Sequence, residues 1–250
     1  MSLAFRPPRT EAQVRADLAA AYRLAAQRGW DDTVYTHLSA SVPGEPDAYL
    51  INPFGLRFDE VCASNLVKVD TGGRVIDGSG QPVNPSGFAI HGTVHSARPE
   101  VECVIHLHTM WGVALSMLPE GLLPCSQFAL RLFGRLGRHA YEGLAFAPDE
   151  RLRLAADLGS LDGLILDNHG TLTVGRTVAE AWMLMYLLER AARAQLAAMA
   201  ATGGRVRVVP DAVAERTRRQ WQGDGSELDG DVEWPALLRG LDRSSPGFRD

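Results

Sequence analysis

The clearest hydrophobic pattern in the chain is the run Val-Glu-Cys-Val-Ile-His-Leu-His at residues 101–108. Its β-branched content and its short length predict a buried β-strand. Because successive side chains of a strand point to opposite faces, Ile105 and Leu107 should share one face, while His106 and His108 share the other. We therefore expect this strand to pack into a core on one side and to present two imidazoles on the other.

Other stretches follow the helical period or are bounded by helix caps. Thr10 with Gln13 and Thr177 with Glu180 read as two capping boxes. The expected helices are 10–27, 87–97, 109–117, 149–158, 177–199 and 211–221. Residues 122–137 are expected to be irregular to helical.

Shorter apolar or alternating runs predict additional strands. They are expected at the end of 30–41, and at 49–52, 65–70, 74–77, 164–167 and 171–174, with 65–70 and 74–77 forming a hairpin. Strands followed by alternating helices favour an α/β layered domain. We expect residues 1–202 to form that domain and residues 203–250 to form a tail. Trp221, Trp234 and Leu238 should dock the tail on the domain or on a neighbouring subunit.

Composition narrows the class of protein. The 250 residues are 46% hydrophobic and 22% charged, with a net charge of −5, which argues against a nucleic-acid surface. No apolar run approaches the roughly 20 residues that span a bilayer, and the first eight residues have no apolar signal core. Three cysteines without a Cys-x-x-Cys pair favour a reducing cytoplasm.

Histidines are the candidate metal ligands. His106 and His108 on one strand face could chelate a divalent ion. Two histidines that each hydrogen-bond to a carbonyl, without a metal, would give the same sequence pattern. His91 and His95 share a helix face, either as a second chelate or as solvated or singly hydrogen-bonded side chains. His169 lies between two predicted strands and, taken alone, reads as a turn residue.

Several short motifs in a fixed order resemble the class II aldolase/adducin family over about residues 10–200. They are Asn-Pro-x-Gly at 52–55, Pro-Ser-x-x-x-x-His at 85–91, Ala-Arg-Pro at 97–99, His-x-His at 106–108 and Asn-His-Gly at 168–170. The tail, with Trp-Pro-Ala-Leu-Leu-Arg from residue 234, resembles the bacterial adducin-like branch. The resemblance implies an α/β/α sandwich around a mainly antiparallel sheet. It also implies a homotetramer with metal sites near subunit interfaces and His106, His108 and His169 as the metal ligands.

The chain departs from the family's sugar-phosphate aldolases at key positions. Gly87 stands where those enzymes have an acid/base glutamate, and a rough match puts Phe128 at their proton-donating tyrosine. Neither residue can transfer a proton. The phosphate-binding motifs appear as Thr36-His37 and Phe54-Gly55, and a loop serine becomes Pro85. These changes argue against a phosphorylated substrate.

The expected function is therefore a divalent-metal-dependent lyase. It would cleave a carbon–carbon bond, by aldol cleavage or decarboxylation, in a small non-phosphorylated oxo or hydroxy acid. Zinc is the favoured metal, at one ion per chain, with iron and manganese as alternatives. A mononuclear iron oxygenase and a non-catalytic adducin-like assembly module are the competing functions. Beyond the metal ligands, we expect catalytic roles for His91 and Arg131. For Arg131, a surface arginine without a catalytic role is an equally good interpretation. The expected substrate contacts are His37, Asn52, Ser86 and Gln127.

Overall fold

A single seven-stranded sheet lies at the centre of the computed structural model, which describes residues 9–143, 148–222 and 229–250. The strands are β1 (His37–Val42), β2 (Glu45–Ile51), β3 (Val67–Asp70), β4 (Cys103–Leu107), β5 (Leu136–His139), β6 (Gly163–Leu166) and β7 (Gly170–Gly175). Their order in the sheet is β3-β2-β1-β4-β7-β6-β5. Neighbouring strands pair antiparallel except for β5 and β6, which pair parallel. The expected mainly antiparallel sheet is confirmed.

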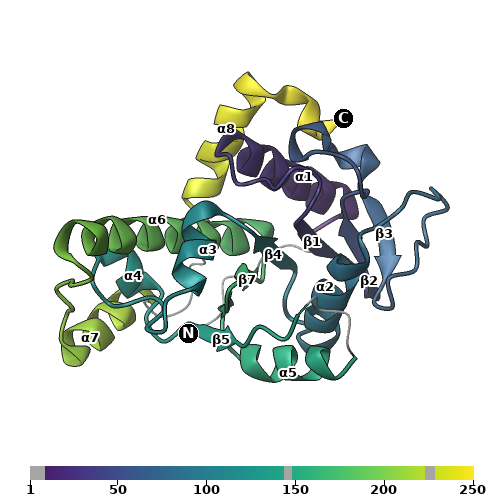
Figure 1. The fold of residues 1–250 in the computed structure, drawn as a ribbon. Coiled ribbons are helices and arrows are strands. Elements are labelled where there is room, and N and C mark those ends of the chain that lie inside the picture. Colours follow the sequence, from purple (N-terminus) through teal and green to yellow (C-terminus); the bar gives the residue numbers. More distant parts are fainter. Residues whose placement is uncertain (1–8, 144–147, 223–228) are drawn as a thin grey trace, which may run out of the picture.

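Helices cover both faces of this sheet (Figure 1). They are α1 (Glu11–Gln27), α2 (Pro85–Ala97), α3 (Met110–Ser116), α4 (Gln127–Arg131), α5 (Pro148–Leu158), α6 (Val178–Thr202), α7 (Asp211–Gln222) and α8 (Glu233–Ser244). Helices α1, α3 and α6 pack on one side of the sheet, and α2 and α5 pack on the other. The three layers match the α/β/α sandwich that the family resemblance implied.

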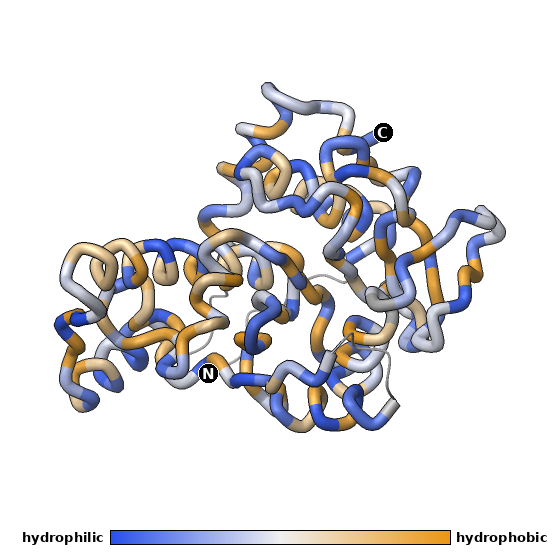
Figure 2. Tube along the Cα trace, in the orientation of Figure 1, coloured by the Kyte–Doolittle hydropathy of each residue, from blue (hydrophilic) through white to orange (hydrophobic). Residues whose placement is uncertain are grey.

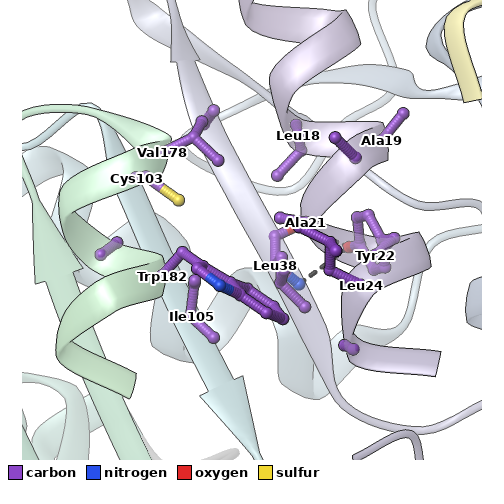
Figure 3. Packing of buried hydrophobic residues seen from close by; sticks show 14 of the residues in the cluster. Leu18, Ala19, Ala21, Tyr22, Leu24, Leu38, Cys103, Ile105, Val178 and Trp182 are labelled. Carbon is purple, nitrogen blue, oxygen red and sulfur yellow. Dashed lines mark hydrogen bonds between the residues drawn. The ribbon is translucent and has the colours of Figure 1, made fainter. Parts of the chain in front are cut away.

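The larger core lies between the sheet, α1 and α6. Leu38 of β1 and Ile105 of β4 are completely buried, and Trp182 of α6 lies over them (Figure 3). Tyr22 of α1 enters the same core and ties it to β1, because its hydroxyl accepts the Leu38 N–H at 2.8 Å. Burial of one such large side chain stabilises the fold by about 1.5–3 kcal/mol. The apolar face predicted for β4 is therefore one wall of this core.

Hydropathy follows the layers. In Figure 2 the hydrophobic colours run along the central strands and α6. None of the helices in the described residues has the length and apolar character needed to cross a membrane. A second apolar cluster fills the space between the sheet and helices α2 and α5, with Val94, Val104, Leu154 and Leu172 among its members. The part of this layer around His37 and Ser39 of β1 and His106 of β4 is polar instead.

Two local expectations were wrong. Residues 136–139, expected to be irregular to helical, form β5 at the sheet edge. The sequence Leu-Gly-Arg-His carries little strand signal, and its parallel pairing with β6 is a long-range effect that local pattern cannot reveal. Residues 74–77 do not form the second strand of a hairpin; they contribute one isolated bridge between Val69 and Val75.

The C-terminal segment folds back over α1 (Figure 1). In α8, Trp234 is buried, and its indole N–H donates to Asp17 of α1 at 3.0 Å. Leu238 packs partly buried against the same core. Trp221 at the end of α7 behaves differently, since 46% of it is exposed. Trp221 instead contacts Arg131 of α4, whose guanidinium lies 4.4 Å from the centroid of its ring, so all three expected anchors contact the domain within this chain.

Candidate metal centre

The centre is built on the pairing of β1 with β4, which places His37 directly opposite His106. Residues opposite each other on antiparallel strands point to the same face. Leu38 and Ile105, the next pair along, point to the opposite face and enter the large core. The alternation predicted for β4 is confirmed, and β1 repeats it with a histidine at the matching position.

Three histidines converge at the end of β4. One ligand atom each from His106, His108 and His169 lies within 4.8 Å of the other two. Their ring centroids are 4.8–4.9 Å apart. His106 is buried, whereas His108 and His169 are only partly covered. The triad expected from the resemblance is therefore assembled in the fold, with one side turned towards the exterior.

Hydrogen bonds fix which ring nitrogen of His106 and which of His108 is free. His106 Nδ1 lies 3.1 Å from the Thr171 carbonyl, and His108 Nδ1 lies 3.0 Å from the Asp32 carboxylate. Both partners are acceptors, so Nδ1 carries the proton and Nε2 keeps a lone pair. The Nε2 atom of His108 is buried and has no hydrogen-bond partner among the described residues. Fixed tautomers with free, converging lone pairs fit a divalent metal ion.

His169 reaches the triad because of a tight turn between β6 and β7. Asn168 adopts a left-handed conformation at φ 55°, which asparagine tolerates better than most residues. The Asn168 N–H donates to the Ser116 carbonyl at 3.2 Å. Gly170 begins β7 so close to β4 that an added Cβ would lie 2.6 Å from the Leu107 oxygen. The Asn-His-Gly motif therefore has a steric reason for each flanking residue.

Strained backbone surrounds the centre. Among the described non-glycine residues, positive φ occurs at Thr33, Thr36 and Asn168. These residues adjoin Asp32, His37 and His169, respectively. A β-branched residue at positive φ costs about 1–3 kcal/mol, and such residues persist where the surrounding structure enforces them, often at functional sites. The strained backbone positions therefore lie next to residues of the histidine centre.

Burial keeps the imidazoles neutral. Burial first, and the nearby His108 second, lower the pKa of His37 to about 3 and that of His169 to about 4. The pKa of His106 is also lowered well below its ordinary value, by burial and then by His169 and His108. Neutral imidazole is the form that binds metal, so these shifts favour metal binding at neutral pH.

A buried row of polar side chains leads away from the triad beneath α2. His37 Nδ1 lies 3.4 Å from His91 Nε2. Ser39 Oγ lies 2.6 Å from His91 Nδ1 and 2.8 Å from His95 Nε2. His91 and His95 are therefore buried and hydrogen-bonded, so the solvated alternative for them was wrong. Among the described residues they form no metal-binding cluster of their own.

The other expected substrate contacts lie in different settings. Asn52 is buried; its Oδ1 lies 2.8 Å from the Tyr22 hydroxyl and its Nδ2 donates to the Pro53 carbonyl. Gln127 is exposed in the first turn of α4. Ser86 lies in the first turn of α2, and its side chain is outside the described part of the structure. Substrate roles for these residues stay predictions.

Arg131 faces the C-terminal segment. Its guanidinium pairs with Asp229 and stacks on Trp221, 4.4 Å from the ring centroid. Arg135 binds the same Asp229 carboxylate at 2.7 Å. These residues line a cavity of about 580 Å³ whose lining does not include the histidine triad. The expected role of Arg131 in catalysis therefore has no support from its contacts within this chain.

Two residues of the site were not anticipated. Asp32 orients His108 from 76 positions away, and Ser39 links His91 to His95. Because side chains alternate along β1, Ser39 lies on the same face of the sheet as His37, and this alternation could have indicated toward which face Ser39 points. No local signal marks Asp32, because its contact depends on how the loop before β1 folds over β4.

Comparison of the chain with known protein families agrees with this geometry. A sequence profile described as "Class II Aldolase and Adducin N-terminal domain" matches residues 16–196. The chain belongs to the class II aldolase/adducin family. It is 48% identical, over all of its length and 97% of the other chain, to a Caulobacter vibrioides protein provisionally named as a class 2 aldolase.

Two other relatives show how varied the family is. Rattus norvegicus alpha-adducin is 37% identical over 93% of this chain, which spans only 33% of that adducin's length. The solved structure of L-fuculose 1-phosphate aldolase from Glaciozyma antarctica is 30% identical, with a TM-score of 0.85. The superposition covers 98% of this chain and 97% of that one. Membership of the family thus confirms the resemblance and leaves the reaction to be argued from the site.

Proposed function

We propose that this protein is a divalent-metal-dependent lyase that cleaves a carbon–carbon bond in a small non-phosphorylated oxo or hydroxy acid. The observation that carries the proposal is the convergence of His106, His108 and His169, with their ligand atoms within 4.8 Å of one another. Three protein ligands leave room for a further ligand, as catalytic metal sites do. One ion per chain is expected, zinc first and iron or manganese next.

The chain's own residues would hold and orient that ion. Thr171 and Asp32 keep the Nε2 atoms of His106 and His108 available. A bound divalent ion supplies Lewis acidity, which polarises a carbonyl and stabilises an adjacent negative charge. Partial exposure of His108 and His169 gives a small acid a route to the centre. Burial of His106 limits the competition from water on the other side.

A non-phosphorylated substrate is supported by the changes at the family's phosphate and acid/base positions. Gly87 supplies no carboxylate, and Phe54 supplies no hydroxyl. The aromatic rings of Phe54 and Tyr35 lie 6.2 Å apart, which makes that part of the loop apolar. Decarboxylation needs no base to begin, so it suits a centre without the glutamate. Assembly as a homotetramer and a cytoplasmic location remain part of the proposal.

A second candidate is an adducin-like assembly module, which the 37% identity to alpha-adducin favours. The retained triad with its fixed tautomers argues for the enzyme, because an assembly surface gains nothing from buried histidines with free lone pairs. Buried polar atoms without partners cost about 1–3 kcal/mol each. Such a cost is understandable where a metal and a substrate supply the missing contacts.

The test is an activity screen with two readouts. Protein loaded anaerobically with zinc, manganese or iron is given a panel of 2-oxo and 2-hydroxy acids, and aldehyde or carbon dioxide release is measured with dioxygen consumption. We expect release without dioxygen, abolished by His106→Ala. If dioxygen is consumed together with substrate, and only when iron is the bound metal, the protein is an oxygenase and the lyase proposal is wrong. Inactivity with all three metals and the whole panel would favour the assembly module.

A further inference from the structure

Besides the triad and the cavity near Arg131, the chain forms a further cavity between the C-terminal end of α1, helix α3 and the middle of α6. Its volume is about 610 Å³, which is in the usual range for small-molecule sites. We call it the arginine cleft, because its wall contains Arg28, Arg190 and Arg193 together with several aromatic rings. Among the described residues, its lining does not include the triad.

The three arginines of the cleft have no acidic partner. Arg28 and Arg190 donate hydrogen bonds to a backbone carbonyl and to a tyrosine hydroxyl, respectively. In the described part of the chain, no aspartate or glutamate forms an ion pair with either of them or with Arg193. Arg135 differs, because two carboxylates, one of them from Asp229, hold its guanidinium. Three uncompensated positive charges in one cavity point to an anionic ligand.

Aromatic rings hold the guanidinium groups in place. Each guanidinium carbon lies over a ring centroid: Arg28 over Trp30 at 5.6 Å, Arg190 over Phe128 at 4.6 Å and Arg193 over Trp111 at 5.9 Å. A guanidinium that stacks through its face keeps the N–H groups at its edge available for hydrogen bonds. Stacking therefore orders these side chains before a ligand arrives, which lowers the entropic cost of binding.

Glu189 also lines the cleft, but it does not neutralise the arginines. It is only 4% exposed, and it forms no ion pair within the described residues. Burial raises its pKa, and the Thr109 hydroxyl and the N–H groups of Trp111 and Gly112 act against this rise. Glu189 therefore interacts with the first turn of α3, and the cleft keeps its positive charge.

We propose that the arginine cleft binds a nucleoside diphosphate, as a ligand distinct from the substrate of the triad. The three guanidinium groups match the roughly three negative charges of a diphosphate near neutral pH, and their N–H forks suit phosphate oxygens. The wall also offers an apolar surface to a base, since it contains aromatic rings and Met110, which is 76% exposed. The inference does not depend on the reaction at the triad.

Three probes separate the charged part of the ligand from its ring. Isothermal titration calorimetry of wild-type protein is done with ADP, with pyrophosphate, which lacks the nucleoside, and with adenosine, which lacks the charge. We expect ADP to bind at least about tenfold more tightly than either, because only ADP engages both the arginines and the apolar wall. Equal affinities for ADP and pyrophosphate, or no binding of ADP at millimolar concentration, would overturn the inference.

Variants test whether ADP lies in the cleft. Arg190 and Arg193 are exposed, so Arg190→Ala and Arg193→Ala should fold normally. Each should weaken ADP binding about tenfold, as the loss of one charge-assisted hydrogen bond predicts. Arg239→Ala, which changes an exposed arginine of α8, is the matched control and should bind ADP like wild type. Unchanged binding in both cleft variants, or an equal loss in the control, would show that ADP does not bind there.

The variant His106→Ala separates the cleft from the triad, since a metal at the triad could itself take up a phosphate group. It should bind ADP with wild-type affinity. Loss of binding in His106→Ala would place ADP at the metal and overturn the inference, while the proposed function would stand. Failure of the lyase screen, in turn, would leave the ADP result unaffected.

A second copy of this chain is the competing occupant of the cleft. Sedimentation velocity compares wild-type protein with the double variant Arg190→Ala, Arg193→Ala at equal concentration. The same oligomeric state is expected for both, because the cleft is open to a small ligand. Dissociation of the double variant would show that the arginines form a subunit contact, and it would overturn the inference.

Discussion

The two faces of strands β1 and β4 differ in character: one contributes to an apolar core and the other to a polar layer. On one face Leu38 and Ile105 enter an apolar core under Trp182. On the other face His37 and His106 lie side by side in a polar layer, in which some nitrogen atoms have no hydrogen-bond partner in the described part of the chain. The apolar face stabilises the fold through burial, whereas the polar face gains its stability only when its lone pairs meet partners. Rigid packing on the first face holds the geometry of the second.

Substitution on the apolar face should have the largest effect on stability. Ile105→Ala is expected to lower the free energy of unfolding by about 2–5 kcal/mol, because it removes a completely buried side chain and leaves a cavity. Urea denaturation followed by circular dichroism measures the change. The folded fraction should still bind metal at the wild-type stoichiometry. A loss of metal with unchanged stability would mean that the two faces are not separate in function.

Acidification should act mainly on the polar face. Burial lowers the pKa of His95 to about 4 from an ordinary value of 6.5. The unfolded chain therefore binds more protons below pH 6.5, and stability should fall as the pH decreases from about 6.5 to 4. For His95 the loss is about 3 kcal/mol. Urea midpoints measured in EDTA across this pH range exclude the effect of metal release.

His95→Gln supplies the comparison for that titration. Glutamine keeps an oxygen that can accept from Ser39 and does not titrate in this range. Its stability should therefore depend less steeply on pH between 6.5 and 4. The same steepness in both proteins would indicate that His95 is already protonated in the folded state or that it is not buried.

A smaller effect is expected from the residue that orients His108. Asp32→Asn removes the carboxylate that fixes Nδ1 as the donor. Metal affinity should fall about 10- to 100-fold, with little change in stability, because the Asp32 side chain is 46% exposed. Competition with a chromophoric chelator measures the affinity. Asp31→Asn, one position earlier, is the matched control, and an equal loss in both variants would contradict the role of Asp32.

Local pattern predicted the apolar face better than the polar one. The Thr10–Gln13 capping box and the alternation around Ile105 depend on neighbouring residues, and both are present in the structure. The pairing of His37 with His106 depends on which strands are neighbours in the sheet, so no local period contains it. The contact of Asp32 with His108 depends on a loop with a strained residue, Thr33, which sequence patterns do not predict.

The resemblance supplied what the local pattern could not. His169 read as a turn residue on its own, and only the order of motifs along the chain grouped it with His106 and His108. The structure adds the reasons, since Asn168 and Gly170 allow the turn that brings His169 to the end of β4. The hydrogen-bonded side chains behind His37 could be identified only from the structure, because Ser39 and His95 are 56 residues apart in the sequence.

The central claim is that the polar face holds one divalent metal ion. Elemental analysis of anaerobically purified wild-type protein, His106→Ala and Ile105→Ala tests it most directly. The account predicts about one ion per chain in wild type and in folded Ile105→Ala, and none in His106→Ala. Wild-type protein that stays metal-free after reconstitution with zinc, manganese and iron, or a His106→Ala variant that keeps its ion, would contradict the account.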